Sequence, residues 1–185
     1  DNRFVVAGSS GSEVYLIRVA DLKGVHVFNE AQHDISSVAF SRAGDQLVTA
    51  GADKIIRIYN LNSLKLDASL RQHKSWIRSV LFINDDQNLI SCSDDQTIYR
   101  WNLRHPGKTN RRIARSPFGW ILTVDSTDDD ERKSTVVAYG SMNGNVKIVY
   151  SFVTYTALLK APVSKVLLLP KPDTQLGVVA ATLGS

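Results

Sequence analysis

The chain has 185 residues, 43% of them hydrophobic and 22% charged, and a formal net charge of +4 at neutral pH. This composition is typical of a globular protein with a sizeable core, and no apolar run approaches the roughly 20 residues of a membrane-spanning helix, so we expect no membrane span. Cys92 is the only cysteine, which excludes an internal disulfide. The sequence shows neither a secretory leader nor an Asn-X-Ser/Thr acceptor, and we therefore expect an intracellular protein, cytoplasmic or nuclear.

Short apolar or alternating runs recur along the whole chain. They are rich in Val, Ile, Tyr and Thr, and Gly, Asn, Asp, Ser and Pro separate them, which is typical of β-strands. No stretch shows three turns of helical apolar spacing, so the pattern predicts an all-β protein. In chain order the expected strands lie at 3–9, 13–19, 24–28, 36–40, 46–51, 54–60, 79–82, 88–93, 97–101, 119–124, 135–141, 145–151, 165–170 and 177–182.

One segment is a rewritten copy of another. Residues 91–103, SCSDDQTIYRWNL, repeat the pattern of residues 49–61, TAGADKIIRIYNL, which lie 42 residues earlier. Each copy has an aspartate six residues before an aromatic ring and follows a histidine: His33, Asp53 and Tyr59 in the first, His73, Asp95 and Trp101 in the second. The repeat therefore covers whole modules of the chain.

A period of about forty residues with about four strands predicts a radial array of four-stranded sheets. Asn143-Gly144 predicts a two-residue hairpin turn between the second and third strands of the fourth module, and the acidic residues 125–134 predict a loop insertion there. We expect a single segment over residues 1–185 with approximate repeats at 1–32, 33–72, 73–117 and 118–160, and a partial repeat at 161–185.

These modules resemble the WD (tryptophan-aspartate) repeats of β-propeller proteins. Repeats of that family open near Gly-His and close on Trp-Asp; here the openings read Gln32-His33 and Gln72-His73, and the closings Tyr59-Asn60 and Trp101-Asn102. The flanking repeats are degenerate. The resemblance implies about four blades of a larger propeller of about seven, with the missing blades supplied by the rest of the parent chain or by another subunit.

The resemblance also implies a role for the repeated polar residues. Asp95 would accept a hydrogen bond from His73, which would link through the Ser91 hydroxyl to Trp101 in a buried polar staple. The matching residues of the second repeat are His33, Thr49, Asp53 and Tyr59. A His, a Ser and an Asp together are also the ingredients of a hydrolase triad, but the trio recurs with Thr in place of Ser and has no nucleophile elbow. We therefore expect no catalytic site.

The remaining candidates for chemistry are weaker. His26 and His105 stand alone and Cys92 has no second cysteine, so no zinc-ligand spacing exists. The acidic run at 128–131 lacks the alternating spacing of a calcium loop, and residues 7–13, AGSSGSE, lack the Gly-Lys-Ser/Thr ending of a phosphate loop. We expect neither a metal nor a cofactor.

In WD-repeat propellers, one face often binds peptides: the face with the connection into each innermost strand and the turn between strands two and three. Alignment on Val38 and Val80 carries these positions onto Asp34, Ser36, Trp76, Arg78 and Asp94, and alignment of the fourth repeat on Val124 adds Trp120 and Met142. Exposed tryptophans beside Arg and Met have the composition of an interface hot spot, although each tryptophan would alternatively cover its own loop. We expect a non-catalytic protein-interaction scaffold in a multiprotein complex, docking proteins or peptides on this face.

A basic stretch supports a second hypothesis. It contains no acid and includes Arg104, Lys108, Arg111, Arg112 and Arg115. Such a stretch could contact nucleic-acid phosphate in a ribonucleoprotein or chromatin component. The simpler interpretation is a solvated edge strand that is kept charged to prevent pairing between sheets.

Overall fold

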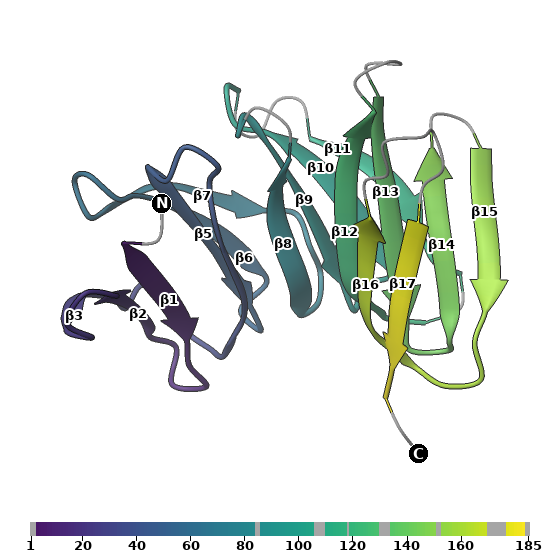
Figure 1. Cartoon of the computed structure of the whole chain (residues 1–185), viewed down its shortest axis with the longest axis horizontal. Coiled ribbons are helices and arrows are strands. Elements are labelled where there is room, and N and C mark those ends of the chain that lie inside the picture. The colour runs from purple at the N-terminus through teal and green to yellow at the C-terminus, as the bar shows by residue number, and fades with distance from the viewer. Residues whose placement is uncertain are drawn as a thin grey trace.

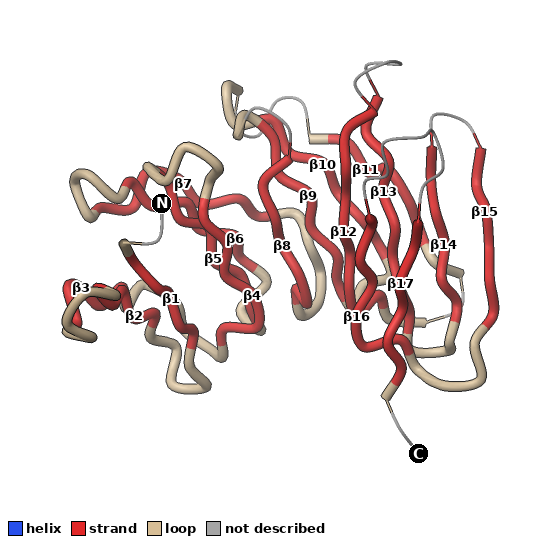
Figure 2. The backbone as a smooth tube through the Cα atoms, in the orientation of Figure 1, coloured by secondary structure: helices blue, strands red, loops and turns tan. Residues whose placement is uncertain are grey.

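The computed structural model describes residues 3–83, 86–105, 110–117, 119–129, 134–150, 153–169 and 177–183. Within these ranges the backbone forms 17 strands and no helix (Figures 1 and 2), so the expected all-β fold is confirmed. All paired strands are antiparallel and follow one another in chain order.

The strands group into five sheets. The first has three strands: β1 (Phe4–Gly8), β2 (Val14–Arg18) and β3 (Gly24–Phe28). Three four-stranded sheets follow, formed by β4 (Ile35–Phe40), β5 (Gln46–Gly51), β6 (Ile55–Asn60) and β7 (Lys65–Arg71); β8 (Ile77–Ile83), β9 (Asn88–Ser93), β10 (Thr97–Asn102) and β11 (Arg111–Arg115); and β12 (Ile121–Asp129), β13 (Ser134–Ser141), β14 (Asn145–Tyr150) and β15 (Val153–Leu158). The last sheet pairs β16 (Val163–Leu169) with β17 (Gly177–Thr182).

Successive sheets pack face to face, and apolar side chains fill the space between them. For example, Val48 and Ile56 of the second sheet form one core with Ile77, Leu89 and Trp101 of the third. Because strand side chains alternate between the two faces, a sheet with neighbours on both sides buries apolar residues in both directions. The first strands of the successive sheets, β4, β8, β12 and β16, lie beside one another, which is the arrangement of propeller blades (Figure 1).

Glycine at or near the end of a strand, Gly8 in β1 and Gly140 in β13, lets the next sheet approach closely. A Cβ atom on Gly8 would lie 2.6 Å from Ile35 Cγ2, and one on Gly140 would lie 2.4 Å from Val163 Cγ1. Ile35 and Val163 each begin the first strand of the following sheet. These glycines therefore set the close contact between neighbouring sheets.

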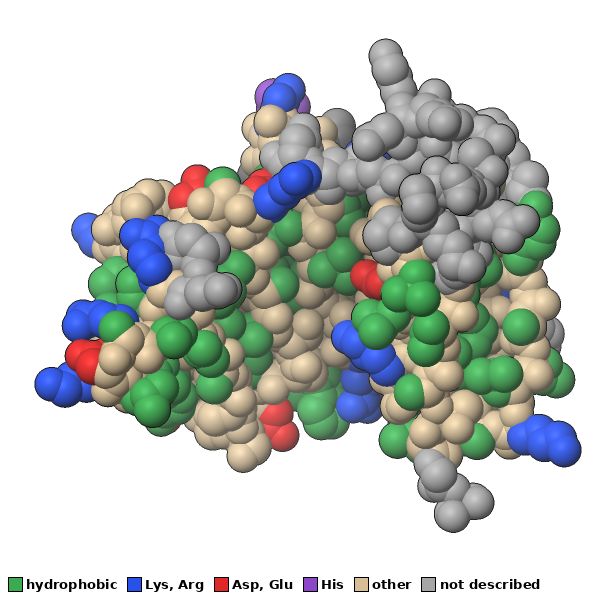
Figure 3. All heavy atoms as spheres, in the orientation of Figure 1, with side chains coloured by type: hydrophobic (Ala, Val, Ile, Leu, Met, Phe, Trp, Pro, Cys, Tyr) green, Lys and Arg blue, Asp and Glu red, His purple; other side chains and the backbone are tan. Residues whose placement is uncertain are grey.

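The outer faces of the two terminal sheets are apolar and exposed. Val5, Tyr15 and Val27 lie exposed on the first sheet, and Leu167 and Val179 lie exposed on the last. Cross-strand register places the members of each set on one side of their sheet. Figure 3 shows hydrophobic side chains over both ends of the described chain.

Two sequence-based predictions about the fourth sheet were only partly correct. The expected two-residue turn at Asn143-Gly144 is instead a three-residue connection between β13 and β14. The Gly144 N–H donates to the Ser141 carbonyl, and Gly144 alone in this connection has a positive φ, +82°. The acidic segment is not entirely a loop insertion: β12 continues to Asp129, so its first residues lengthen the β12–β13 hairpin. Residues 130–133 lie outside the described ranges.

Candidate partner-binding face

The third sheet contains a closed hydrogen-bond network, which we call the polar staple: His73, Ser91, Asp95 and Trp101. His73 Nδ1 lies 2.8 Å from Asp95 Oδ2, and His73 Nε2 lies 2.7 Å from Ser91 Oγ. The Trp101 indole N–H donates to the same Ser91 oxygen at 2.8 Å. One tautomer satisfies every group: Nδ1–H donates to Asp95, and Nε2 accepts from the Ser91 hydroxyl. The network joins the connection before β8 to strands β9 and β10.

The Asp95 carboxylate is held in its charged form. Burial raises its pKa, but hydrogen bonds from His73, from the Thr97 hydroxyl and from the Lys74 backbone N–H outweigh burial and hold the pKa well below its ordinary range. The carboxylate is therefore ionised near neutral pH.

The staple cannot act as a hydrolase triad on a substrate. Ser91 is 0% exposed and its oxygen already contacts both His73 and Trp101. A nucleophile must reach the reacting atom, and this hydroxyl lies inside the core between two sheets. The arrangement suits a role in holding the sheet together.

The second sheet does not repeat this network, and the prediction that His33 belongs to it was wrong. His33 is exposed, and Asp53 instead pairs with Arg57, whose Nη1 lies 2.6 Å from Asp53 Oδ2. Both side chains are buried, at 4% and 3% exposure. A guanidinium from the neighbouring strand therefore replaces the imidazole.

The structural register explains this difference. The backbone N–H of Lys74 donates to Asp95, and the backbone N–H of Gln32, 42 residues earlier, donates to Asp53. His73 therefore corresponds to the buried Ala31, while His33 corresponds to Ser75. The sequence contained the signal, because the spacing of 42 residues that relates Asp53 to Asp95 does not relate the two histidines.

The other two predicted members of that network are buried. Tyr59 takes the place of Trp101 and contacts Phe28 of the first sheet, with ring centroids 4.4 Å apart. Burial and the nearby Glu30 carboxylate raise the pKa of the Tyr59 hydroxyl. Thr49 is fully buried, and its hydroxyl has no hydrogen-bond partner among the described residues.

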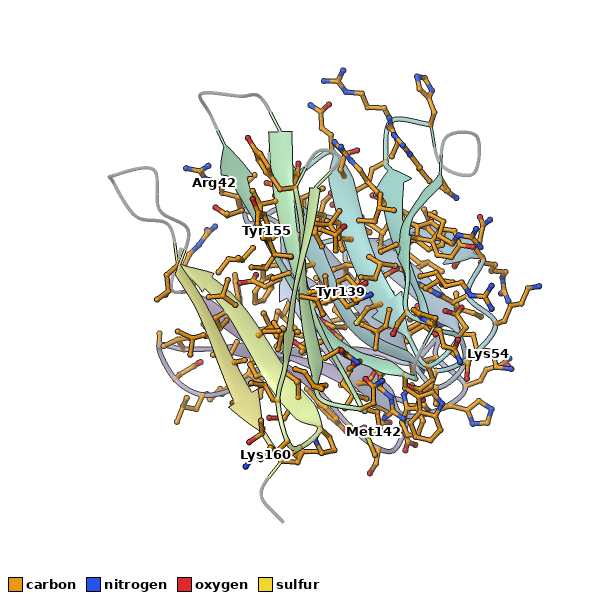
Figure 4. The ribbon with its side chains drawn as sticks, turned by 90° about the vertical axis from the view of Figure 1, so that its right-hand side faces the viewer. Arg42, Lys54, Tyr139, Met142, Tyr155 and Lys160 are labelled. Carbon is orange, nitrogen blue, oxygen red and sulfur yellow. The ribbon has the colours of Figure 1, made fainter. Side chains whose placement is uncertain are left out.

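The predicted docking positions gather at one end of the sheets. Backbone hydrogen bonds of equal geometry join Ala52 N to Asp34 O, Asp94 N to Trp76 O and Met142 N to Trp120 O, at 2.9, 3.0 and 2.9 Å. The second residue of each first strand, where the register shifts, is Ser36 in β4, Arg78 in β8 and Leu122 in β12. Figure 4 shows Met142 at this end and Arg42 at the opposite end.

We call Trp76, Arg78, Asp94, Trp120 and Met142 the tryptophan face. Arg78 donates from Nε to Asp94 Oδ1 at 2.8 Å and from Nη2 to Asp94 Oδ2 at 2.6 Å. Its guanidinium carbon lies 4.1 Å from the centre of the Trp76 ring and 6.0 Å from that of Trp120. A bidentate carboxylate and two aromatic rings thus fix one cation, and a β-bulge directs its side chain toward them.

The members of this face differ in exposure. Trp120 and Met142 are 47% and 42% exposed, so both are open to a partner. Trp76 is half-buried, and its indole N–H has no hydrogen-bond partner among the described residues. The Asp94 carboxylate lies beneath Arg78 and positions it.

The two predicted positions from the second repeat contribute less. The exposed Ser36 directs its hydroxyl to the carbonyl oxygens of Ala50 and Ile77, so it links β4 to the third sheet. Asp34 is half-buried, and its backbone carbonyl accepts a hydrogen bond from the Ala52 N–H.

The basic stretch forms the outer edge of the third sheet. Arg111, Arg112 and Arg115 are exposed on β11, and the exposed Arg104 precedes that strand. Lys108 lies outside the described residues.

Within the part of the chain that the structure describes, no group of three or more His, Cys, Asp or Glu side chains is placed to hold a metal ion. Among the same residues there is also no helix of the length and hydrophobicity needed to cross a bilayer.

A tandem array of antiparallel four-stranded sheets, one of which carries a His–Asp–Ser–Trp network, defines the class of repeat protein. Residues 23–60 and 64–102 match the family described as WD domain, G-beta repeat. These two stretches are therefore similar to WD repeats, and the sheets are arranged as β-propeller blades are.

Three similar proteins share parts of this sequence. A WD repeat-containing protein 91 homolog from Dictyostelium discoideum is 31% identical over 55% of this chain and 13% of its own length. A DDB1- and CUL4-associated factor 13 from the same organism is 29% identical over 52% of this chain and 22% of its own length. The serine-threonine kinase receptor-associated protein of Mus musculus is 33% identical over 38% of this chain and 20% of its own length. The matched stretches thus span less than a quarter of these relatives.

Proposed function

We propose that the chain is a non-catalytic protein-interaction scaffold, a subunit of an intracellular multiprotein complex, and that it docks a protein or peptide partner on the tryptophan face. The observation that carries the proposal is the fixed Arg78 beside the exposed Trp120 and Met142. Trp and Arg are enriched among residues that dominate interface energies, and a side chain that is already ordered loses little entropy when a partner binds.

The contacts of Arg78 also indicate what the partner presents. Asp94 occupies two of the five guanidinium N–H donors, and the described residues offer no partner to the other three. The exposed Lys160 lies at the same end of the sheets as Met142 (Figure 4). A partner segment with a carboxylate for Arg78 and an apolar side chain for Trp120 would therefore fit this face.

Two further considerations support a scaffold. The names of two relatives describe them as an associated factor and a receptor-associated protein, that is, as proteins that associate with others. The apolar outer faces of the terminal sheets need cover, which we assign to further blades from the parent chain or from another subunit.

Affinity purification of the full-length protein with nuclease treatment tests this proposal. The Trp120→Ala/Met142→Ala variant should lose partners that the wild type retains, while the melting temperature changes little because both side chains are nearly half exposed. Leu66→Ala on the outer strand β7, where Leu66 is 37% exposed, is the matched control and should keep those partners. Retention of every partner by the double variant would contradict the proposed face.

The exposed arginines of β11 support nucleic-acid binding as a second candidate function. Binding that neutralises several phosphates weakens steeply with salt, by roughly 10³-fold or more between 50 and 200 mM for six or more contacts. Fluorescence anisotropy with a labelled single-stranded RNA would measure this dependence for the wild type and for Arg111→Gln/Arg112→Gln/Arg115→Gln. No binding at 50 mM salt, or binding that the triple variant retains, would count against this candidate.

A further inference from the structure

The outer strand of the fourth sheet differs from the other outer strands in its pairing. β3, β7 and β11 each pair with their neighbour through a register shift, at Leu16/Ile17, Ile58/Tyr59 and Ile98/Tyr99 respectively. β15 pairs with β14 over six consecutive positions without any shift. Because a bulge bends and twists an edge, β15 is the one regular outer strand among the described sheets.

β15 also lacks charge. β7 carries Lys65, Asp67 and Arg71, and β11 carries three arginines, whereas the sequence of β15 is VTYTAL. Residues 154–158 are all exposed, with Tyr155 at 62% and Leu158 at 73%. Charges and bulges are the usual protection of a strand edge against pairing, and β15 has neither.

The hydrogen-bond register shows which backbone groups face outward. The N–H of Leu159, just after β15, donates to the Gly144 carbonyl at 2.8 Å. Since an antiparallel ladder alternates hydrogen-bonded and non-bonded pairs, Tyr155 and Ala157 direct their N–H and C=O groups toward β14. Thr154, Thr156 and Leu158 direct theirs away from the sheet, where no described strand pairs with them (Figure 1).

We infer that β15 is a self-association edge, and that its occupant is the β15 of a second copy of this chain, paired antiparallel about a two-fold axis at Tyr155. The segment Thr154-Tyr155-Thr156 reads the same in both directions, so each threonine of one copy lies opposite a threonine of the other. The outward N–H and C=O groups of Thr154 and Thr156 then form backbone hydrogen bonds with the same groups of the opposite threonines in the second copy. Thr–Thr and aromatic–aromatic cross-strand pairs are both favourable.

The expected dimer is weak. A single added strand buries much less than the roughly 1,200 Å² of a standard stable interface. Association should therefore depend on protein concentration, and a symmetric contact of this kind closes at two copies. This surface is separate from the tryptophan face, so it stands or falls independently of the proposed function.

Sedimentation velocity of the full-length protein over a range of concentrations, with variants at the axis, tests the inference. Tyr155→Lys and Tyr155→Glu each place like charges opposite one another, and each alone should raise the dissociation constant by about tenfold. An equimolar mixture of the two variants should recover association, because the axis then pairs opposite charges. Leu66→Lys, the same type of change on outer strand β7, should dimerise like the wild type.

Thr156→Pro removes an outward N–H without removing a bond to β14, and it should also give a monomer that melts like the wild type. A wild-type protein that stays monomeric at every concentration would overturn the inference. So would a dimer that both charged variants leave intact, or a mixture of the two that associates no better than either alone.

Discussion

Asp53 and Asp95 occupy equivalent positions in consecutive blades, yet different side chains donate hydrogen bonds to them. Asp95 receives a hydrogen bond from His73 on the connection before the blade, and Asp53 receives one from Arg57 on the adjacent strand. Where the histidine is replaced by Ala31, the guanidinium fills the same demand, because a buried carboxylate needs a hydrogen-bonded partner. Each buried aspartate therefore needs a hydrogen-bond donor, but the residue that supplies the donor differs between the two sheets.

The replacement of a histidine donor by Arg57 can be tested by introducing a histidine at position 31. Arg57→Tyr, which copies Tyr99 of the third sheet, leaves Asp53 buried without its cation and should destabilise the protein by about 3–5 kcal/mol. Adding Ala31→His should recover part of that loss, as measured by urea unfolding monitored by circular dichroism. His33→Ala, at an exposed side chain, is the control and should change stability by about 0.5 kcal/mol or less. Failure of Ala31→His to recover stability would show that the two positions are not equivalent.

The low pKa of Asp95 makes its contribution depend on pH. Because the native pKa lies below the unfolded value of about 4, the stabilisation is fully present above pH 4 and is lost as pH falls toward the native pKa. Asp95→Asn should therefore melt below the wild type at pH 7, and the difference should narrow at pH 3. Differential scanning calorimetry at both values measures this, and a difference that stays constant or widens in acid would refute the assignment.

At the scale of strands and turns, the sequence predicted the inner strands better than the outer ones. Strands such as β5 and β9 are buried on both faces, so they appear as apolar runs of β-branched residues. β7, β11 and β15 are largely exposed, and their apolar pattern is too weak to mark them. The two-residue turn was mispredicted because Asn-Gly also suits a longer turn, in which only the glycine has a positive φ.

Gly144 offers a test of how closely that turn packs against the backbone after β15. A Cβ atom there would lie 2.3 Å from the Leu159 carbonyl oxygen, and φ is +82°. Gly144→Ala should therefore destabilise the protein by about 2 kcal/mol or more. Gly44, with φ +73° but open space around its Cβ position, is the matched control, and Gly44→Ala should cost only the backbone strain of about 1 kcal/mol. Equal losses in thermal melts of the two variants would rule out the close contact.

At the scale of the whole molecule, the array presents three kinds of surface to its surroundings. The tryptophan face lies at one end of the sheets, the outer strands form an edge of each sheet, and the outer faces of the terminal sheets are apolar and exposed. The repeat alignment placed the members of the tryptophan face at equivalent positions of their sheets. It could do so because, in each sheet, the turn after the second strand donates the same backbone hydrogen bond to the connection before the first strand. It could not show that Asp94 lies beneath Arg78 or that Trp76 is half-buried, since both depend on side-chain packing.

The most direct test of the proposed docking face is hydrogen–deuterium exchange of the full-length protein, free and within the complex purified with it. We predict slower exchange in the complex at residues 74–78, 94–96, 119–122 and 141–144, which carry the tryptophan face, and little change at residues 65–71 of β7. Protection confined to β11, or absent from these four segments, would contradict the account.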